Sequence, residues 1–143
     1  MGQKYRKSSH GLYDLKVHIV WITKYRYPVL EGAVALRLRE LVRRICAEND
    51  TAIISGVVSP KHVHVLVSYP PNISLSKLVQ FMKGTSSRKL QQEFPALGKR
   101  YWGQHLWVRG FFAVSTGNVT SDMIENYIKH HKDEDDEFTV SRS

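Results

Sequence analysis

Apolar residues recur along this chain with two different periods, and each period predicts a kind of element. Residues 13–21 alternate apolar with polar side chains, which is typical of a half-buried strand. Residues 31–48 instead place apolar side chains three and four positions apart, on one face of a helix. The same two patterns predict further strands over 52–58, 62–67 and 106–114, and further helices over 74–94 and 121–131.

These elements follow the order strand, helix, strand, strand, helix, strand, helix. The order predicts an α+β fold, a ferredoxin-like (RRM-like) βαββαβ sandwich with an antiparallel sheet and an added C-terminal helix. The first two helices are expected to cover one face of the sheet and to leave the other face open. We expect one domain over residues 1–143, with a flexible basic arm at 1–11, a basic and aromatic loop at 95–105 and an acidic tail at 133–143.

The strand at 62–67 carries the candidate chemistry. Its side chains alternate, so Val63, Val65 and Val67 line one face, while His62 and His64 line the other. The Cα atoms of the two histidines are then about 6–7 Å apart, which lets both imidazoles converge on one divalent metal ion. The alternative is a solvent-facing strand that carries two histidines by chance.

The last predicted helix supplies a tyrosine and a possible third ligand. Tyr127 and His131 are four residues apart and therefore share a helical face. His131 could join His62 and His64 around a metal ion, with the phenol beside it. His130 is the competing candidate, about 100° around the helix.

A histidine-held metal ion beside a tyrosine suits phosphodiester chemistry. A phenol is a weak nucleophile, because its pKa is about 10. A metal ion on the scissile phosphate withdraws charge and orients the group for in-line attack. A covalent phosphotyrosine then divides one strand exchange into two transesterifications, which require no ATP.

The charge distribution favours a polyanionic partner. The net charge is +8, and residues 133–137 are all acidic, so residues 1–132 carry 20 Lys and Arg against 8 Asp and Glu. A body this basic suggests nucleic acid as the partner, whereas a generic basic surface is the alternative.

Several classes of protein are disfavoured by what the sequence lacks. Cys46 is the only cysteine, which excludes an internal disulfide and a cysteine zinc cluster. No apolar run approaches the roughly 20 residues that span a bilayer, and the basic, polar N-terminus does not resemble a signal peptide. We expect a cytoplasmic protein with no membrane partner and, in the absence of a P-loop motif, no nucleotide cofactor.

Basic and aromatic residues in the second half of the chain are the candidates for DNA contacts. The expected phosphate partners are Lys83, Arg88, Lys89, Lys99, Arg100 and Arg109, and the side chains expected to stack on unpaired bases are Tyr101 and Trp102. Other residues are given structural roles: Trp21, Trp107, Phe111 and Phe112 are assigned to the core, His18 to a structural position, and Lys24 and Arg26 to the solvated surface.

Four segments, in this order, resemble the single-tyrosine HUH transposases of small bacterial insertion sequences. They are residues 18–21 with 24–26, then 61–64, 83–88 and 126–130, which read HIVW with KYR, KHVH, KGTSSR and NYIKH. The resemblance covers nearly the whole chain, roughly residues 13 to 132.

The resemblance implies a homodimer whose active sites each combine the histidine pair of one subunit with the tyrosine helix of the other. It implies Mg²⁺ or Mn²⁺, and single-stranded DNA with hairpin ends that is cut and rejoined through a 5′-phosphotyrosine with release of a 3′-OH. On this chain His62 and His64 become ligands and Tyr127 the nucleophile. The family's third ligand, four residues after the tyrosine, is usually Gln or Asn, so His131 is a departure.

Two other functions remain compatible with the sequence. One is a non-enzymatic RRM-like module that binds single-stranded nucleic acid, although such modules typically present aromatic residues on the open face. The other is a domesticated HUH nickase, which would normally carry further domains.

Overall fold

A computed structural model describes residues 6–8, 11–115, 122–123 and 125–129 of the chain. The central sheet has four antiparallel strands in the order β4-β5-β3-β6. These strands are β3 (Lys16–Ile22), β4 (Ala52–Ser59), β5 (His62–Ser68) and β6 (Phe112–Val114). By position along the chain, the sheet order is second, third, first and fourth, which confirms the expected ferredoxin-like topology.

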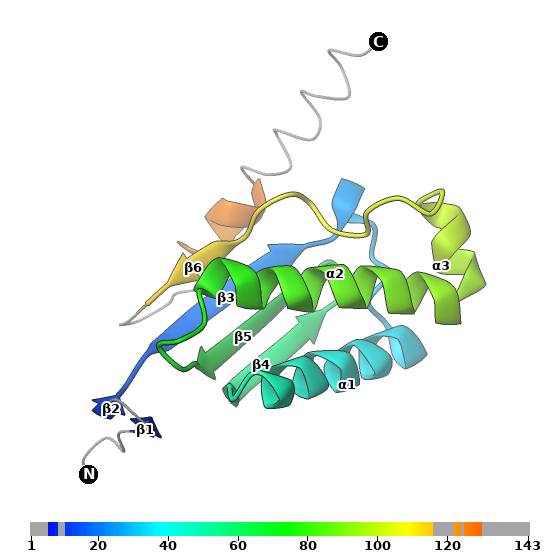
Figure 1. Cartoon of the computed structure of the whole chain (residues 1–143). Coiled ribbons are helices and arrows are strands. Elements are labelled where there is room, and N and C mark those ends of the chain that lie inside the picture. The colour runs from blue at the N-terminus through cyan, green and yellow to red at the C-terminus, as the bar shows by residue number, and fades with distance from the viewer. Residues whose placement is uncertain (1–5, 9–10, 116–121, 124, 130–143) are drawn as a thin grey trace.

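Two long helices cover one face of the sheet. α1 (Gly32–Glu48) and α2 (Leu75–Glu93) lie side by side in front of it in Figure 1. Ser74 caps the N-terminus of α2: its hydroxyl accepts a hydrogen bond from the Lys77 backbone N–H at 3.1 Å, as an N-cap residue does. None of the described helices is long and apolar enough to cross a bilayer.

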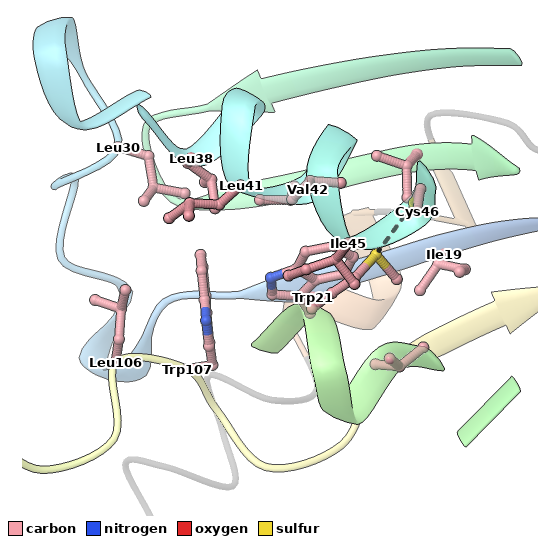
Figure 2. Packing of buried hydrophobic residues seen from close by; sticks show 14 of the residues in the cluster. Ile19, Trp21, Leu30, Leu38, Leu41, Val42, Ile45, Cys46, Leu106 and Trp107 are labelled. Atoms are coloured by element: carbon pink, nitrogen blue, oxygen red, sulfur yellow. Dashed lines mark hydrogen bonds between the residues drawn. The ribbon is translucent and has the colours of Figure 1, made fainter. Parts of the chain in front are cut away.

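The core lies between these helices and the valine face of β5. Val63, Val65 and Val67 are all buried, as the alternation predicts. Trp21 and Trp107 are buried too, and their rings meet edge to face with centres 5.9 Å apart (Figure 2). The assignment of both tryptophans to the core is confirmed.

The single cysteine belongs to this core. Cys46 lies in α1, and its Sγ is 4.0 Å from the Sδ atom of Met82 on α2, the contact dashed in Figure 2. Burial raises the pKa of the Cys46 thiol to about 11.

A short hairpin lies within the segment expected to be a basic arm. β1 (Arg6–Ser8) pairs antiparallel with β2 (Gly11–Tyr13). The Arg6 guanidinium donates to the backbone carbonyls of Ser68, at 2.6 Å, and of Asp50, at 2.5 Å. These bonds tie residues 6–8 to the end of β5 and to the turn after α1.

Two expected elements between residues 95 and 114 differ in the structure. Part of the expected loop is a helix, α3 (Pro95–Arg100), which has proline in its first turn and buries Leu97. Of the strand expected over 106–114, only β6 (Phe112–Val114) is present. Trp107 forms only an isolated bridge with Thr23, and the chain turns at Gly110, which has a φ of 87°.

The second face of the sheet is covered in part, not open as expected. Residues 122–123 and 125–129 are helical, and Figure 1 shows this orange segment behind β3 and β6, on the side opposite α1 and α2. Val20 and Ile22 alternate with the core residues of β3 and so point to this second face. Both are 0% exposed.

Candidate functional site

The histidine pair lies on the second face, where β5 alternation puts it. His62 and His64 are half-buried, while the valines between and after them face the core. Burial lowers the pKa of both imidazoles, and a neighbouring histidine lowers each further, His64 acting on His62 and His18 on His64. The neutral imidazole is therefore favoured, and this is the form that binds a metal ion.

His18, expected from the sequence to be only structural, is a partner of this pair. It lies on β3 opposite Leu66, one diagonal step from His64. Its Nδ1 is 3.1 Å from the His64 Nε2, and the ring centres are 5.3 Å apart. The sequence shows only that His18 alternates with apolar residues. Its contact with His64 could not be predicted from this pattern, because the contact depends on the pairing of β3 with β5.

Tyr127 belongs to the helical segment on the same face. Its ring lies 5.5 Å from the ring of Phe112 on β6, measured between centres. Phe112 pairs with Val20, and Val20 pairs with His64, so these three residues form one cross-strand row. Adjacent strands are about 4.8 Å apart, so about 10 Å of sheet separates Phe112 from His64.

The metal site can be compared with the structure only in part. His131 and the competing His130 lie outside the described residues. Among the residues that are described, no three His, Cys, Asp or Glu side chains gather closely enough to hold a metal ion. His62 and His64 supply two imidazole donors, which bind divalent first-row transition metals, so the pair could hold such an ion only as part of a larger ligand set.

Arg26, assigned to the solvated surface, contacts the tyrosine segment. It is half-buried, and its Nη1 donates a hydrogen bond at 3.2 Å to the backbone carbonyl of Ile128, the residue after Tyr127. No periodic pattern in the sequence connects residues so distant along the chain.

A groove of about 1410 Å³ lies on the α2 side of the molecule. Five of the residues expected to contact DNA line this groove: Lys83, Arg88, Lys99, Trp102 and Arg109. Lys24 adds a further cation, and no Asp or Glu is among the described residues that line the groove. The groove therefore has the positive charge that contact with a nucleic-acid backbone requires.

Three of the expected DNA contacts lie outside this lining: Lys89, Arg100 and Tyr101. Tyr101 is only 1% exposed, and its hydroxyl donates to the backbone carbonyl of Lys24 at 3.2 Å. Burial is also the main cause that raises its pKa. The expectation that Tyr101 stacks on bases is therefore wrong, because its ring is packed in the core. The Arg100 guanidinium lies 4.0 Å from the centre of the Tyr27 ring.

Lys83 and Trp102 occupy contrasting positions in the groove. Lys83 Nζ donates to the carbonyls of Val108, at 2.8 Å, and Gly110, at 2.6 Å. Burial lowers its pKa to about 8, so the ammonium form still predominates near neutrality. Trp102 is 74% exposed, which leaves its ring available for stacking.

Comparison with known proteins identifies the family. Residues 11–131 match the family described as Transposase IS200 like. The chain is 33% identical to the ISDra2 transposase TnpA of Deinococcus radiodurans, over 91% of this chain and 93% of that protein. It is 31% identical to the transposase for insertion sequence element IS200 of Salmonella typhimurium, over 89% of this chain and 83% of that protein.

Solved structures agree with this match. A crystal structure described as a transposase from Deinococcus radiodurans R1 has a TM-score of 0.81 at 31% identity, and covers 88% of this chain and 97% of that one. The fold is also that of a REP-associated tyrosine transposase bound to a REP hairpin, with a TM-score of 0.53 at 18% identity over 92% of this chain and 74% of that one. Because the matches span most of its length, the chain belongs to the IS200-like transposase family.

Proposed function

We propose that this transposase cuts and rejoins single-stranded DNA at insertion-sequence ends, with Tyr127 as nucleophile. One observation carries the proposal: the tyrosine and the histidine pair share a face of the sheet. Tyr127 packs on Phe112, which is aligned through Val20 with His64. A DNA strand on this face could meet both groups.

Mg²⁺ or Mn²⁺ is the proposed cofactor, held by His62, His64 and His131. The lowered pKa of the first two histidines supports this role, because neutral imidazoles leave the full charge of the cation to act on a phosphate. When bound, the ion withdraws charge from the non-bridging oxygens of the scissile phosphate. The assignment of His131 rests on the resemblance and on its position four residues after Tyr127.

The proposed reaction has two balanced steps. In the first, the Tyr127 Oη bonds to phosphorus, the bond to the 3′ oxygen breaks, and the departing oxygen gains a proton in place of the one that the phenol loses. The products are a 5′-phosphotyrosine and a free 3′-OH. In the second, a 3′-OH attacks the phosphotyrosine and restores the phenol. The number of phosphodiester-type linkages stays constant.

The basic groove is the proposed binding surface for hairpin DNA. Arg88, Lys99 and Arg109 are assigned to phosphate contacts, and Trp102 to stacking on an unpaired base. Lys83 adds its charge while it holds the loop at residues 108–110 in place.

A homodimer is the proposed assembly, and the β4 edge of the sheet supports it. β4 is an outer strand whose eight residues include no charged side chain. Ile54 and Val57 on it are 49% and 56% exposed. A long, uncharged edge strand is a ready template for pairing with another chain.

The test uses labelled single-stranded insertion-sequence ends with Mn²⁺, followed by a denaturing gel. An oligonucleotide labelled at its 3′ end should move with the protein, whereas a 5′ label should appear on a shorter free fragment. Tyr127→Phe should bind the same DNA within about twofold and form no conjugate, because only the nucleophilic oxygen is removed.

Tyr13→Phe is the matched control, since it also removes one phenol oxygen and keeps the ring over Arg6. It should form the conjugate at the wild-type rate. A conjugate formed by Tyr127→Phe would show that another residue is the nucleophile. Cleavage that persists in excess chelator would overturn the metal assignment.

A further inference from the structure

The turn that joins β3 to the rest of the chain has an unusual backbone. Tyr25 and Arg26, in η1 (Lys24–Arg26), have φ angles of 59° and 50°. Two consecutive residues with a side chain in the left-handed region are rare, because the Cβ atom crowds the backbone there. Such a conformation persists only where its surroundings hold it.

This turn is braced on several sides. The Thr23 hydroxyl donates to the carbonyl of Tyr27 at 2.9 Å. The Lys24 N–H donates to the carbonyl of Leu106 at 2.8 Å, and the buried Tyr101 hydroxyl donates to the carbonyl of Lys24 at 3.2 Å. The turn therefore forms a rigid block with the loop after α3.

Two hydrogen bonds connect this block to the two halves of the proposed active site. The Thr23 N–H donates at 2.9 Å to the carbonyl of Lys61, the residue before the first histidine of the pair. The Arg26 guanidinium donates at 3.2 Å to the carbonyl of Ile128, the residue after the proposed nucleophile. One small turn thus contacts the direct chain neighbours of a ligand and of the tyrosine.

We propose that Arg26 is a positioning residue that sets the place of Tyr127 relative to the histidine pair. The inference rests on the proposed function for its effect on catalysis. The left-handed backbone aims the guanidinium at the tyrosine segment, and a planar guanidinium fixes direction better than a flexible ammonium does. A displacement of about 1 Å between reacting groups is enough to slow a reaction about 100-fold.

The test compares variants of the full-length protein that lack the guanidinium. Arg26→Gln removes it, and Arg26→Asn removes it while placing at this position a residue that tolerates the left-handed backbone. Both should slow conjugate formation 10- to 100-fold at saturating DNA, with the DNA dissociation constant within twofold of wild type. Arg39→Gln, an exposed arginine of α1, is the control and should change neither quantity.

Hydrogen exchange supplies a readout that does not depend on catalysis. Amides of the peptide containing residues 125–129 should exchange faster in both Arg26 variants than in wild type or Arg39→Gln. Unchanged exchange there would overturn the inference, whether or not the protein formed a DNA conjugate. Failure of the wild-type protein to form any conjugate would separately refute the proposed function.

Three further results would also contradict a positioning role. Conjugate formation at the wild-type rate would show that the contact with Ile128 does not matter for the reaction. A loss confined to Arg26→Gln would assign the effect to the backbone of the turn. Weaker DNA binding with a salt slope reduced by about 1 would make Arg26 a phosphate contact.

Discussion

The hydrogen bond between His18 and His64 limits the protonation states of both rings. One of the two nitrogens must carry a hydrogen and the other must offer a lone pair, so two doubly protonated rings cannot form it. Burial and neighbouring imidazoles already lower the pKa of His62 and His64. The folded chain therefore disfavours protonation of the residues that the proposed function needs neutral.

This preference predicts a dependence of stability on pH. The ordinary pKa of histidine is 6.5, and below it the unfolded chain takes up protons that the folded His62 and His64 accept only at lower pH. The free energy of unfolding should therefore fall as the pH drops below about 6.5. Urea denaturation at neutral pH and about two units lower measures the fall.

The double variant His62→Gln/His64→Gln is the comparison for this experiment. It should lose less stability than wild type over the same pH interval, because its glutamines do not titrate. An equal loss in both proteins would assign the acid sensitivity to other groups.

For individual residues of the site, the direction of a side chain could be predicted from the sequence, whereas its contacts could not. Alternation alone places His62 and His64 opposite Val63. The contact of His18 with His64 requires the register of two strands, and that of Arg26 with Ile128 joins residues 102 positions apart. Neither relation is contained in a local pattern.

Among the elements, the loop at residues 108–110 depends on a lysine of α2. Val108 accepts from Lys83 through its carbonyl and donates its N–H to the carbonyl of Ile22 at 2.9 Å. Gly110 offers Lys83 a second carbonyl and supplies the positive φ at which the chain turns. The loop carries Arg109, which lines the basic groove.

Lys83→Met should therefore destabilise the fold and leave most phosphate contacts in place. Loss of charge-assisted hydrogen bonds to two carbonyls should lower the free energy of unfolding by about 1–3 kcal/mol. Lys99→Met, the matched control at an exposed lysine, should leave stability unchanged but reduce the salt slope of DNA binding by about 1.

Urea denaturation and salt titrations of DNA binding distinguish the two lysines. A Lys83→Met protein of wild-type stability whose salt slope falls by about 1 would show that Lys83 binds phosphate directly.

The long elements could be predicted closely, but the short ones between residues 95 and 114 could not. The helix expected over 31–48 is α1 (Gly32–Glu48), and the histidine strand differs by one residue. α3 has six residues, too few to establish a helical period, and is fixed instead by burial of Leu97. β6 begins only at Phe112, after the turn at Gly110 and the two carbonyls that accept hydrogen bonds from Lys83.

For the molecule as a whole, the exposed edge of β4 bears on assembly. Two apolar residues on this strand face solvent. One edge of β4 is hydrogen-bonded to β5, and the other edge has no neighbouring strand among the described residues. A lysine on an edge strand opposes pairing, because its charge would have to be buried.

Val57→Lys should accordingly weaken the proposed homodimer. We expect the dissociation constant, measured by sedimentation equilibrium, to rise at least about tenfold, which corresponds to about 1.4 kcal/mol. Leu36→Lys, which removes an equally exposed apolar residue on α1, should have no effect. A dimer unchanged by Val57→Lys would place the contact on another surface.

The burial of Cys46 makes the protein convenient for site-selective labelling. Maleimide and similar reagents attack through the thiolate, and a buried thiol with a pKa of about 11 supplies almost none at neutral pH. A cysteine introduced on the surface would be the sole reactive thiol of the native chain. Dyes or spin probes can therefore be attached beside the tyrosine helix or the groove without first replacing the natural cysteine.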